Sequence, residues 1–294
     1  MHFYRKFTAN FTTKKLIYMI NRIFKTLLVF VALTATATSY ASRIDTLMVR
    51  SEKMDREIEV IVVVPEQAIN NQKCPALYLL HGYGGDARTW LNIKPELKNM
   101  ADRDGAFIVC PDGENSWYWD SPTNPKSQFE TFVAKELVEY IDSNYNTIKN
   151  RSGRAITGLS MGGHGGLWLS IRHKDTFGAG GATSGGVDIR PFPNNWEMKK
   201  QLGEMSSNID VWNNHTVINQ LDKIKNGDLA IIFDCGSGDF FFEVNNNLHE
   251  ELLKRGIDHD YITRAGVHNG KYWNNSIEYQ WHYFCKFFKG YRSK

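Results

Sequence analysis

A serine flanked by glycines is the feature that most constrains what this chain can fold into. A short apolar run enters the Gly-Leu-Ser-Met-Gly stretch of residues 158–162, and a helix-like stretch follows. This order is typical of a sharp strand-to-helix turn, in which a side chain at Gly158 or Gly162 would clash with the neighbouring backbone. The turn places Ser160 beside the amino end of the helix, where free amides favour negative charge. We interpret Ser160 as a nucleophile, and the alternative is a glycine-rich turn with an incidental serine.

Apolar runs and amphipathic stretches alternate along the rest of the chain. The sequence predicts strands at residues 45–50, 57–64, 75–80, 106–110, 155–158, 178–183, 229–234 and 260–264. It predicts helices at residues 90–101, 129–145, 163–173, 246–255 and 276–288. The first two strands are expected to be antiparallel. Regular alternation after them predicts an α/β domain whose mostly parallel sheet is covered by helices on both faces.

Residues 186–226 are the least regular part of this pattern. They contain two prolines and two tryptophans among polar residues. An insertion between late strands often covers a substrate pocket, and a surface excursion remains the alternative.

The first 41 residues resemble a targeting segment. They contain six Lys or Arg and no acidic residue. Lys25 precedes an apolar run at residues 26–33, and small residues then lead to Ser39-Tyr40-Ala41, a pattern that predicts signal-peptide cleavage before Ser42. We expect translation to begin at Met19, with residues 1–18 as an upstream extension, and residues 42–294 to form the mature domain.

This interpretation predicts a periplasmic or secreted protein without stable membrane insertion after cleavage, and a retained membrane anchor is the alternative. Of the 35 basic and 32 acidic residues in the chain, 35 − 6 = 29 basic and all 32 acidic ones remain in residues 42–294. The resulting net charge of −3 argues against a nucleic-acid partner.

Four cysteines occur without metal-binding spacing. There is no C-x-x-C pair and no His/Cys ligand pattern, so we predict no metal site and no cofactor. Cys110 and Cys235 end apolar runs and are expected to be buried free thiols. Sequence alone does not determine whether any of the four pair, or the oligomeric state.

Asp239 and His268 follow late strands in the order that a serine nucleophile requires. A serine hydroxyl needs a base to remove its proton, and the base needs a third group to orient it. In α/β sheets these groups come from loops at the carboxyl ends of strands, in the order Ser, acid, His. Asp239 lies in a Gly-Ser-Gly-Asp turn and His268 lies in the loop after the last strand. We predict Ser160, Asp239 and His268 as the catalytic residues.

Both partners of the serine have competitors in the sequence. His259 lies at the start of a strand and His282 lies inside a helix, so neither occupies a loop after a strand. Among the acids, Asp188 and Asp210 lie upstream, and Asp234 ends its own strand, where an aspartate can simply cap a turn. Asp239 and His268 are therefore preferred.

Two backbone amides are expected to bind the oxyanion of an acyl-transfer transition state. One is the N–H of Met161, directly after the serine. The other is the N–H of Tyr83, in the glycine-rich turn of residues 81–85. We interpret His81 in the same turn as structural.

Five motifs together resemble the putative-esterase family of α/β-hydrolases. They are residues 81–85, 116–118, 158–163, 235–239 and 266–268. This family includes esterase D (S-formylglutathione hydrolase), the mycolyltransferases of the antigen 85 type, and the feruloyl and acetylxylan esterases of carbohydrate esterase family one. The resemblance covers residues 50–290 and implies an α/β-hydrolase fold with the triad and oxyanion amides named above. Val267 departs from the second glycine common in relatives, and Trp119-Asp120 departs from their usual small residue and Asn.

These features predict a serine carboxylic-ester hydrolase that works through an acyl-enzyme. The resemblance implies feruloyl or acetyl esters of plant polysaccharides as substrates. Trp117, Tyr118 and Trp119 are predicted to form a substrate-binding wall, with core packing as the alternative. Alternative functions are a thioesterase of the S-formylglutathione hydrolase type, an acyltransferase to a sugar, and an inactive carbohydrate-binding protein.

Overall fold

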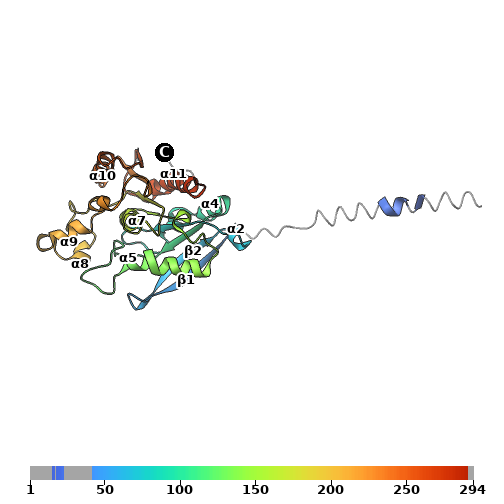
Figure 1. Ribbon diagram of the computed structural model, residues 1–294, viewed down its shortest axis with the longest axis horizontal. Coiled ribbons are helices and arrows are strands. Elements are labelled where there is room, and N and C mark those ends of the chain that lie inside the picture. The colour runs from blue at the N-terminus through green and yellow to red at the C-terminus, as the bar shows by residue number, and fades with distance from the viewer. Residues whose placement is uncertain (1–14, 17, 23–41, 291–294) are drawn as a thin grey trace, which may run out of the picture. The chain divides into compact units, whose positions relative to one another are not determined.

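An eight-stranded sheet is the centre of the computed structural model, which describes residues 15, 16, 18–22 and 42–290 (Figure 1). The strand order is β1-β2-β4-β3-β5-β6-β7-β8. β1 and β4 pair with β2 in antiparallel fashion, and all other neighbouring strands are parallel. The strands are β1 (Arg43–Ser51), β2 (Arg56–Val64), β3 (Ala76–Leu80), β4 (Phe107–Pro111), β5 (Arg154–Gly158), β6 (Ala179–Thr183), β7 (Ala230–Gly236) and β8 (Asp260–Arg264). The predicted mostly parallel sheet with two antiparallel strands at its start is confirmed.

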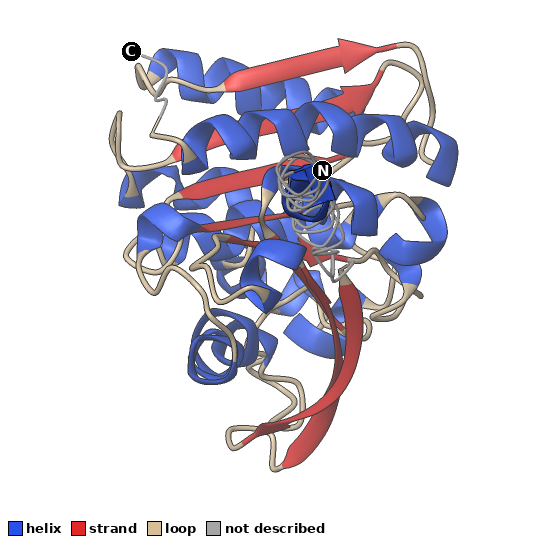
Figure 2. Cartoon of the chain, turned by 90° about the vertical axis from the view of Figure 1, so that its right-hand side faces the viewer, coloured by secondary structure: helices blue, strands red, loops and turns tan. Residues whose placement is uncertain are grey.

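Helices cover both faces of the sheet (Figure 2). They are α2 (Glu66–Ile69), α3 (Thr89–Ile93), α4 (Leu97–Asp104), α5 (Phe129–Thr131), α6 (Leu137–Asn144), α7 (Met161–Arg172), α8 (Met198–Leu202), α9 (Ile209–Asn214), α10 (Phe242–Lys254) and α11 (Gly270–Phe288). A π-helical turn at Phe132–Glu136 joins α5 to α6. The core clusters place α6, α7 and α10 on one face and α3, α4 and α11 on the other.

Strand β3 shows why the central strands are continuously apolar. Tyr78 and Leu80 pack into the core on one face, whereas Leu77 and Leu79 pack into the core on the other. Because successive side chains of a strand point to opposite faces, a strand covered on both sides must be apolar at every position.

Several predicted helices differ from the observed ones. The predicted helix at residues 129–145 is interrupted by the π-helical turn, and α10 begins at Phe242 rather than at residue 246. The predicted helix at residues 90–101 is divided into α3 and α4, because Pro95 restricts the preceding Lys94 to a non-helical backbone (φ −130°, ψ 80°). Helix α11 begins at Gly270, earlier than predicted, because the Asn269 side chain accepts a hydrogen bond from the Tyr272 amide and caps its first turn.

The chain divides into two units, Met1–Tyr40 and Ala41–Lys294, and the sheet belongs to the second. Residues 15, 16 and 18–22 of the first unit are helical. The predicted apolar run at residues 26–33 and the cleavage motif at residues 39–41 lie outside the described residues. In the part of the chain that is described, no helix is long and apolar enough to cross a membrane.

Candidate active site

Ser160 occupies the turn between β5 and α7. Its backbone has φ 56° and ψ −115°, a conformation that costs a non-glycine residue on the order of 1–3 kcal/mol. A Cβ at Gly158 would lie 2.5 Å from the Leu80 carbonyl oxygen, and one at Gly162 would lie 2.3 Å from the same atom. The two glycines therefore let β5 and α7 approach β3 closely, and this contact fixes the strained serine at the carboxyl end of the sheet.

Ser160, His268 and Asp239 form a continuous hydrogen-bonded chain. The distance from Ser160 Oγ to His268 Nε2 is 2.9 Å. His268 Nδ1 lies 2.9 Å from Asp239 Oδ2 and 3.0 Å from its Oδ1. Because a carboxylate only accepts hydrogen bonds, Nδ1 carries the proton and Nε2 presents its lone pair to the serine hydroxyl. The structure thus brings the three predicted residues together in the geometry that transfers a proton from Ser160 to His268.

The Asp239 carboxylate is buried and held in one orientation. Its side chain has no exposed surface, whereas 14% of the His268 side chain is exposed. The Phe241 amide donates to Asp239 Oδ1 at 2.9 Å and so holds the carboxylate toward the imidazole. The rings of Phe240 and Trp273 pack around His268, with centroids 4.2 and 5.0 Å away.

Asp234, the competing acid, makes a different set of contacts. It accepts hydrogen bonds from Thr183 at 2.7 Å, Ser276 at 2.6 Å and Gln280 at 2.6 Å. These partners lie on β6 and α11, so Asp234 joins two strands to the last helix. Burial raises the pKa of its carboxyl, and the three donors oppose that rise.

The glycine-rich turn after β3 lies directly against the serine. A Cβ at Gly82 would lie 3.3 Å from the Ser160 Cβ, which places this backbone beside the nucleophile. Within the described residues, no acceptor is bonded to the backbone amide of Tyr83 or of Met161. Both predicted oxyanion donors are therefore free of a protein acceptor.

His81 anchors the same turn. Its Nδ1–H donates to the Gly82 carbonyl at 2.7 Å, and its Nε2 accepts from the Gly113 amide at 2.7 Å. Both ring nitrogens are thus occupied by backbone, which matches the structural role predicted for this histidine.

The predicted substrate wall of Trp117, Tyr118 and Trp119 requires correction. All three side chains are almost completely buried, with exposed fractions of 1%, 0% and 0%. Trp117 stacks on Trp119 at 5.6 Å, and both rings contact the edge of the buried His164. The Tyr118 hydroxyl donates to the His81 carbonyl at 3.1 Å. These residues pack in the core behind the site, which is the alternative that the sequence left open.

His164, in the first turns of α7, is neutral in this environment. Its Nδ1–H donates to the Gly186 carbonyl at 3.0 Å, and its ring stacks on Trp168. Burial lowers its pKa to about 3.

Two aromatic residues near His268 were not identified from the sequence. Phe240 is 49% exposed, and Trp196 stacks on it with ring centroids 5.5 Å apart. Trp196 belongs to the irregular segment of residues 186–226 and has a left-handed backbone (φ 47°). The aromatic pair at residues 240–241 directly follows Asp239, and this position could have indicated that Phe240 lies near the site. No local sequence feature connects Trp196 with the site.

The irregular segment also reaches the oxyanion turn. Glu197, adjacent to Trp196, lies beside the Tyr83 phenol, and burial together with this carboxylate raises the Tyr83 pKa. The segment therefore contacts both Phe240 beside His268 and the turn that carries Tyr83, which favours the pocket-covering interpretation over a surface excursion. Among the described residues, no three His, Cys, Asp or Glu side chains gather as a metal site.

Known proteins are similar to this chain over most of its length. The acetyl esterase of Caldicellulosiruptor saccharolyticus is 26% identical over 250 residues, which cover 77% of this chain and 92% of that protein. A solved ferulic acid esterase is 27% identical, with a TM-score of 0.72 and coverage of 84% and 98%. The fluorophosphonate-binding serine hydrolase FphF of Staphylococcus aureus shares the fold at 20% identity, with a TM-score of 0.75 and coverage of 83% and 98%. The model of the family described as "Putative esterase" matches residues 51–281. The chain therefore belongs to this esterase family and has the α/β-hydrolase fold.

Proposed function

We propose that this protein is a serine carboxylic-ester hydrolase that works through an acyl-enzyme, with Ser160 as nucleophile, His268 as base and Asp239 as acid. The observation that carries the proposal is the pair of 2.9 Å contacts that His268 makes with Ser160 and Asp239. Membership of an esterase family supports the same reaction class.

Each residue has a defined part in the proposed reaction. His268 removes the proton from Ser160 as Oγ attacks the ester carbonyl, and the amides of Tyr83 and Met161 stabilise the negative oxygen. His268 then donates its proton to the leaving alcohol. A water molecule, activated by the same imidazole, releases the acid and restores Ser160. Asp239 keeps the imidazole in the required tautomer and stabilises its positive charge.

The proposed substrates are acetyl or feruloyl esters of plant polysaccharides in the periplasm or outside the cell. Similarity to an acetyl esterase and to a ferulic acid esterase supports this class. The exposed ring of Phe240 beside His268 offers an apolar surface for an acyl group. The targeting pattern of residues 1–41 supports export.

A substrate panel separates this function from its alternatives. We expect methyl ferulate or acetylated xylan to be hydrolysed with a higher kcat/KM than S-formylglutathione. A strong preference for the thioester would instead favour the thioesterase. Product that appears only with an added sugar acceptor would favour acyl transfer.

The first test of the mechanism is Ser160→Ala. We expect kcat to fall by a factor on the order of 10⁴ or more, because the nucleophile is lost. Labelling by a fluorophosphonate probe should also disappear, while the melting temperature stays near that of the wild type. Ser237→Ala, an exposed serine in the loop that carries Asp239, is the matched control and should keep both labelling and turnover. Hydrolysis retained by Ser160→Ala would contradict the assignment.

A further inference from the structure

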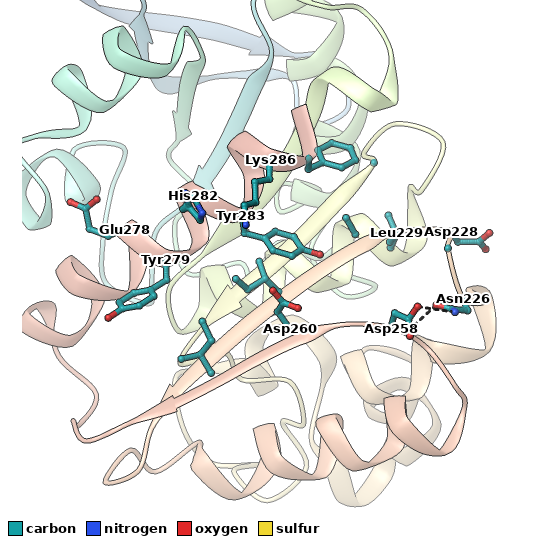
Figure 3. A pocket seen from close by; sticks show the side chains of 16 residues that line it. Asn226, Asp228, Leu229, Asp258, Asp260, Glu278, Tyr279, His282, Tyr283 and Lys286 are labelled. Carbon is teal, nitrogen blue, oxygen red and sulfur yellow. Dashed lines mark hydrogen bonds between the residues drawn. The ribbon is translucent and has the colours of Figure 1, made fainter. Parts of the chain in front are cut away.

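A cavity lies along the outer strands of the sheet, on the face that packs against α11. It has a volume of about 750 Å³ and opens between the edge strand β8, the neighbouring β7 and helix α11 (Figure 3). It is bordered by Ala230 and Asp260, the first residues of β7 and β8, whereas Asp239 and His268 follow the carboxyl ends of those strands. The cavity therefore begins at the amino ends of β7 and β8 and extends along them as far as Ile262 and Tyr279.

The cavity exists because α11 leaves the outer strand uncovered. Ile232 and Ile262 form an apolar floor on the face of the sheet that α11 covers elsewhere. Tyr279 and Tyr283 lie four residues apart on α11, so both project from one face of the helix over this floor. Figure 3 shows Tyr283 reaching over the strands, with Asp260 pointing toward it from β8.

Tyr279 is held as a fixed, half-exposed ring. The Arg264 guanidinium lies over the ring, 4.5 Å from its centroid, and the same guanidinium lies 4.9 Å from the centroid of Tyr272. Stacking on the guanidinium occupies one face of the Tyr279 ring. Because Tyr279 is 47% exposed, its remaining surface is open to a ligand.

Acidic oxygens dominate the charge at the rim. Four carboxylates border the cavity, at Asp228, Asp258, Asp260 and Glu278. Asp228 pairs with Lys174 and Glu278 pairs with Lys94, both at 2.6 Å. Asp258 accepts from the Asn226 amide at 3.1 Å, whereas Asp260 has no hydrogen-bond or ion-pair partner for its carboxylate within residues 42–290. The rim thus offers a free hydrogen-bond acceptor at Asp260, and Lys286 is a cation among the lining residues.

We propose that this cavity binds a neutral polysaccharide chain at a second, non-catalytic site. A pyranose ring presents an apolar face that packs on an aromatic ring and hydroxyl groups that donate to carboxylates, and the cavity offers both in Tyr279 and Asp260. Its volume lies in the range of sites for small ligands, whereas a protein partner needs about 800 Å² of complementary surface on each side.

The second site extends the proposed function. It depends on that function only for the identity of the polysaccharide, not for the existence of the site. A chain anchored in this cavity keeps its acyl groups at a high effective concentration near Ser160. The site should therefore raise kcat/KM for a polymeric ester and leave the hydrolysis of a small ester unchanged.

Binding of unacylated xylohexaose tests the site without involving the reaction. We expect isothermal titration calorimetry to detect binding to wild-type protein and to protein blocked at Ser160 by a fluorophosphonate, with the same Kd. Tyr279→Ala should weaken binding at least tenfold, because the stacking surface is lost, and Asp260→Asn at least threefold. Tyr279→Phe, which keeps the ring, and Asp210→Asn, an exposed acid on α9, should bind as the wild type does.

Steady-state kinetics on a small and a polymeric ester distinguish the second binding site from the proposed catalytic site. All four variants should keep their kcat/KM for p-nitrophenyl acetate within a factor of two, whereas Tyr279→Ala and Asp260→Asn should lose activity on acetylated xylan. If Tyr279→Ala does not fold, Asp260→Asn decides the result. Xylohexaose binding in a protein that hydrolyses no polysaccharide ester would support the second site and contradict the proposed substrate. The second site is overturned if wild-type protein binds no xylohexaose, if both variants bind it normally, or if sedimentation shows that the two substitutions dissociate a dimer.

Discussion

Two buried aspartates near the carboxyl end of β7 differ in what they contact. Asp239 accepts from the imidazole of His268, whereas Asp234 accepts from side chains of β6 and α11. At the scale of single residues, Asp239 has the contact that the proposed acid requires, whereas Asp234 joins structural elements.

Substituting each aspartate separates these roles. Asp239→Asn should lower kcat by about 10³–10⁴, because the amide no longer enforces the proton on Nδ1, and should change stability little. Asp234→Asn should lower the free energy of unfolding by about 1–3 kcal/mol. The new side-chain NH₂ group is a donor, and it replaces an oxygen that accepts from Thr183 or Gln280, so one buried hydrogen bond is lost. The kcat of Asp234→Asn should stay within a few-fold of the wild type. Steady-state kinetics and denaturant unfolding of both variants check this, and the reverse pattern would make Asp234 the acid.

Buried His164 predicts a pH dependence of stability. Burial lowers its pKa from 6.5 to about 3 in the folded protein, so between these values the unfolded chain binds more protons than the folded one. Stability should therefore decrease as pH falls from about 6.5 toward 3, with a slope of up to about 1.4 kcal/mol per pH unit from this group. His164→Asn keeps a donor for the Gly186 carbonyl and removes the titration. Its free energy of unfolding should fall less steeply with acid than that of the wild type, and identical slopes would contradict the assignment.

At the scale of elements, the irregular segment between β6 and β7 determines the surface around the triad. Its Trp196 stacks on Phe240, whose ring contacts His268, and its Glu197 meets Tyr83 on the other side of the site. Loops that sit between scaffold elements vary without disturbing the sheet, so this segment is suited to set substrate preference.

Trp196→Ala tests that function of the segment. We expect kcat/KM for methyl ferulate to fall about tenfold, equivalent to about 1.4 kcal/mol, because the wall behind an aromatic acyl group is removed. The kcat/KM for p-nitrophenyl acetate should change less than threefold. Trp196→Phe should restore most of the activity, and Ile209→Ala, an exposed position of the same segment, should behave as wild type. Equal losses on both esters would show that Trp196 supports the fold rather than selectivity.

At the scale of the whole molecule, all four cysteines are buried and unpaired. Burial raises the pKa of the Cys74 thiol to about 11 and of the Cys110 thiol to about 12. Because the thiolate is the reactive form, these groups should be inert in the folded protein.

Thiol titration with Ellman's reagent checks this prediction. We expect almost no reaction with native protein, and reaction of all four thiols in concentrated guanidinium chloride. Fewer than four reactive thiols after unfolding would reveal a disulfide, and rapid reaction of the native protein would show that a thiol is accessible.

The sequence by itself determined the order of the strands along the chain, the turn around Ser160 and the positions of Asp239 and His268 after late strands. Such features are local, because apolar periodicity, glycine and the end of a strand all act within a few residues. The helix break at Pro95 also has a local cause. It was missed because the apolar pattern of the predicted helix at residues 90–101 continues across the proline.

Only the tertiary structure decided which side chains meet across the fold. It buried Trp117, Tyr118 and Trp119, brought Trp196 to Phe240, and left the outer strand β8 beside α11 uncovered. These outcomes depend on how the helices pack on the sheet and on the path of a long irregular segment. The same aromatic residue types occur in cores and on binding surfaces. Tertiary packing, rather than residue type, therefore decides whether such a residue is buried or contacts a ligand.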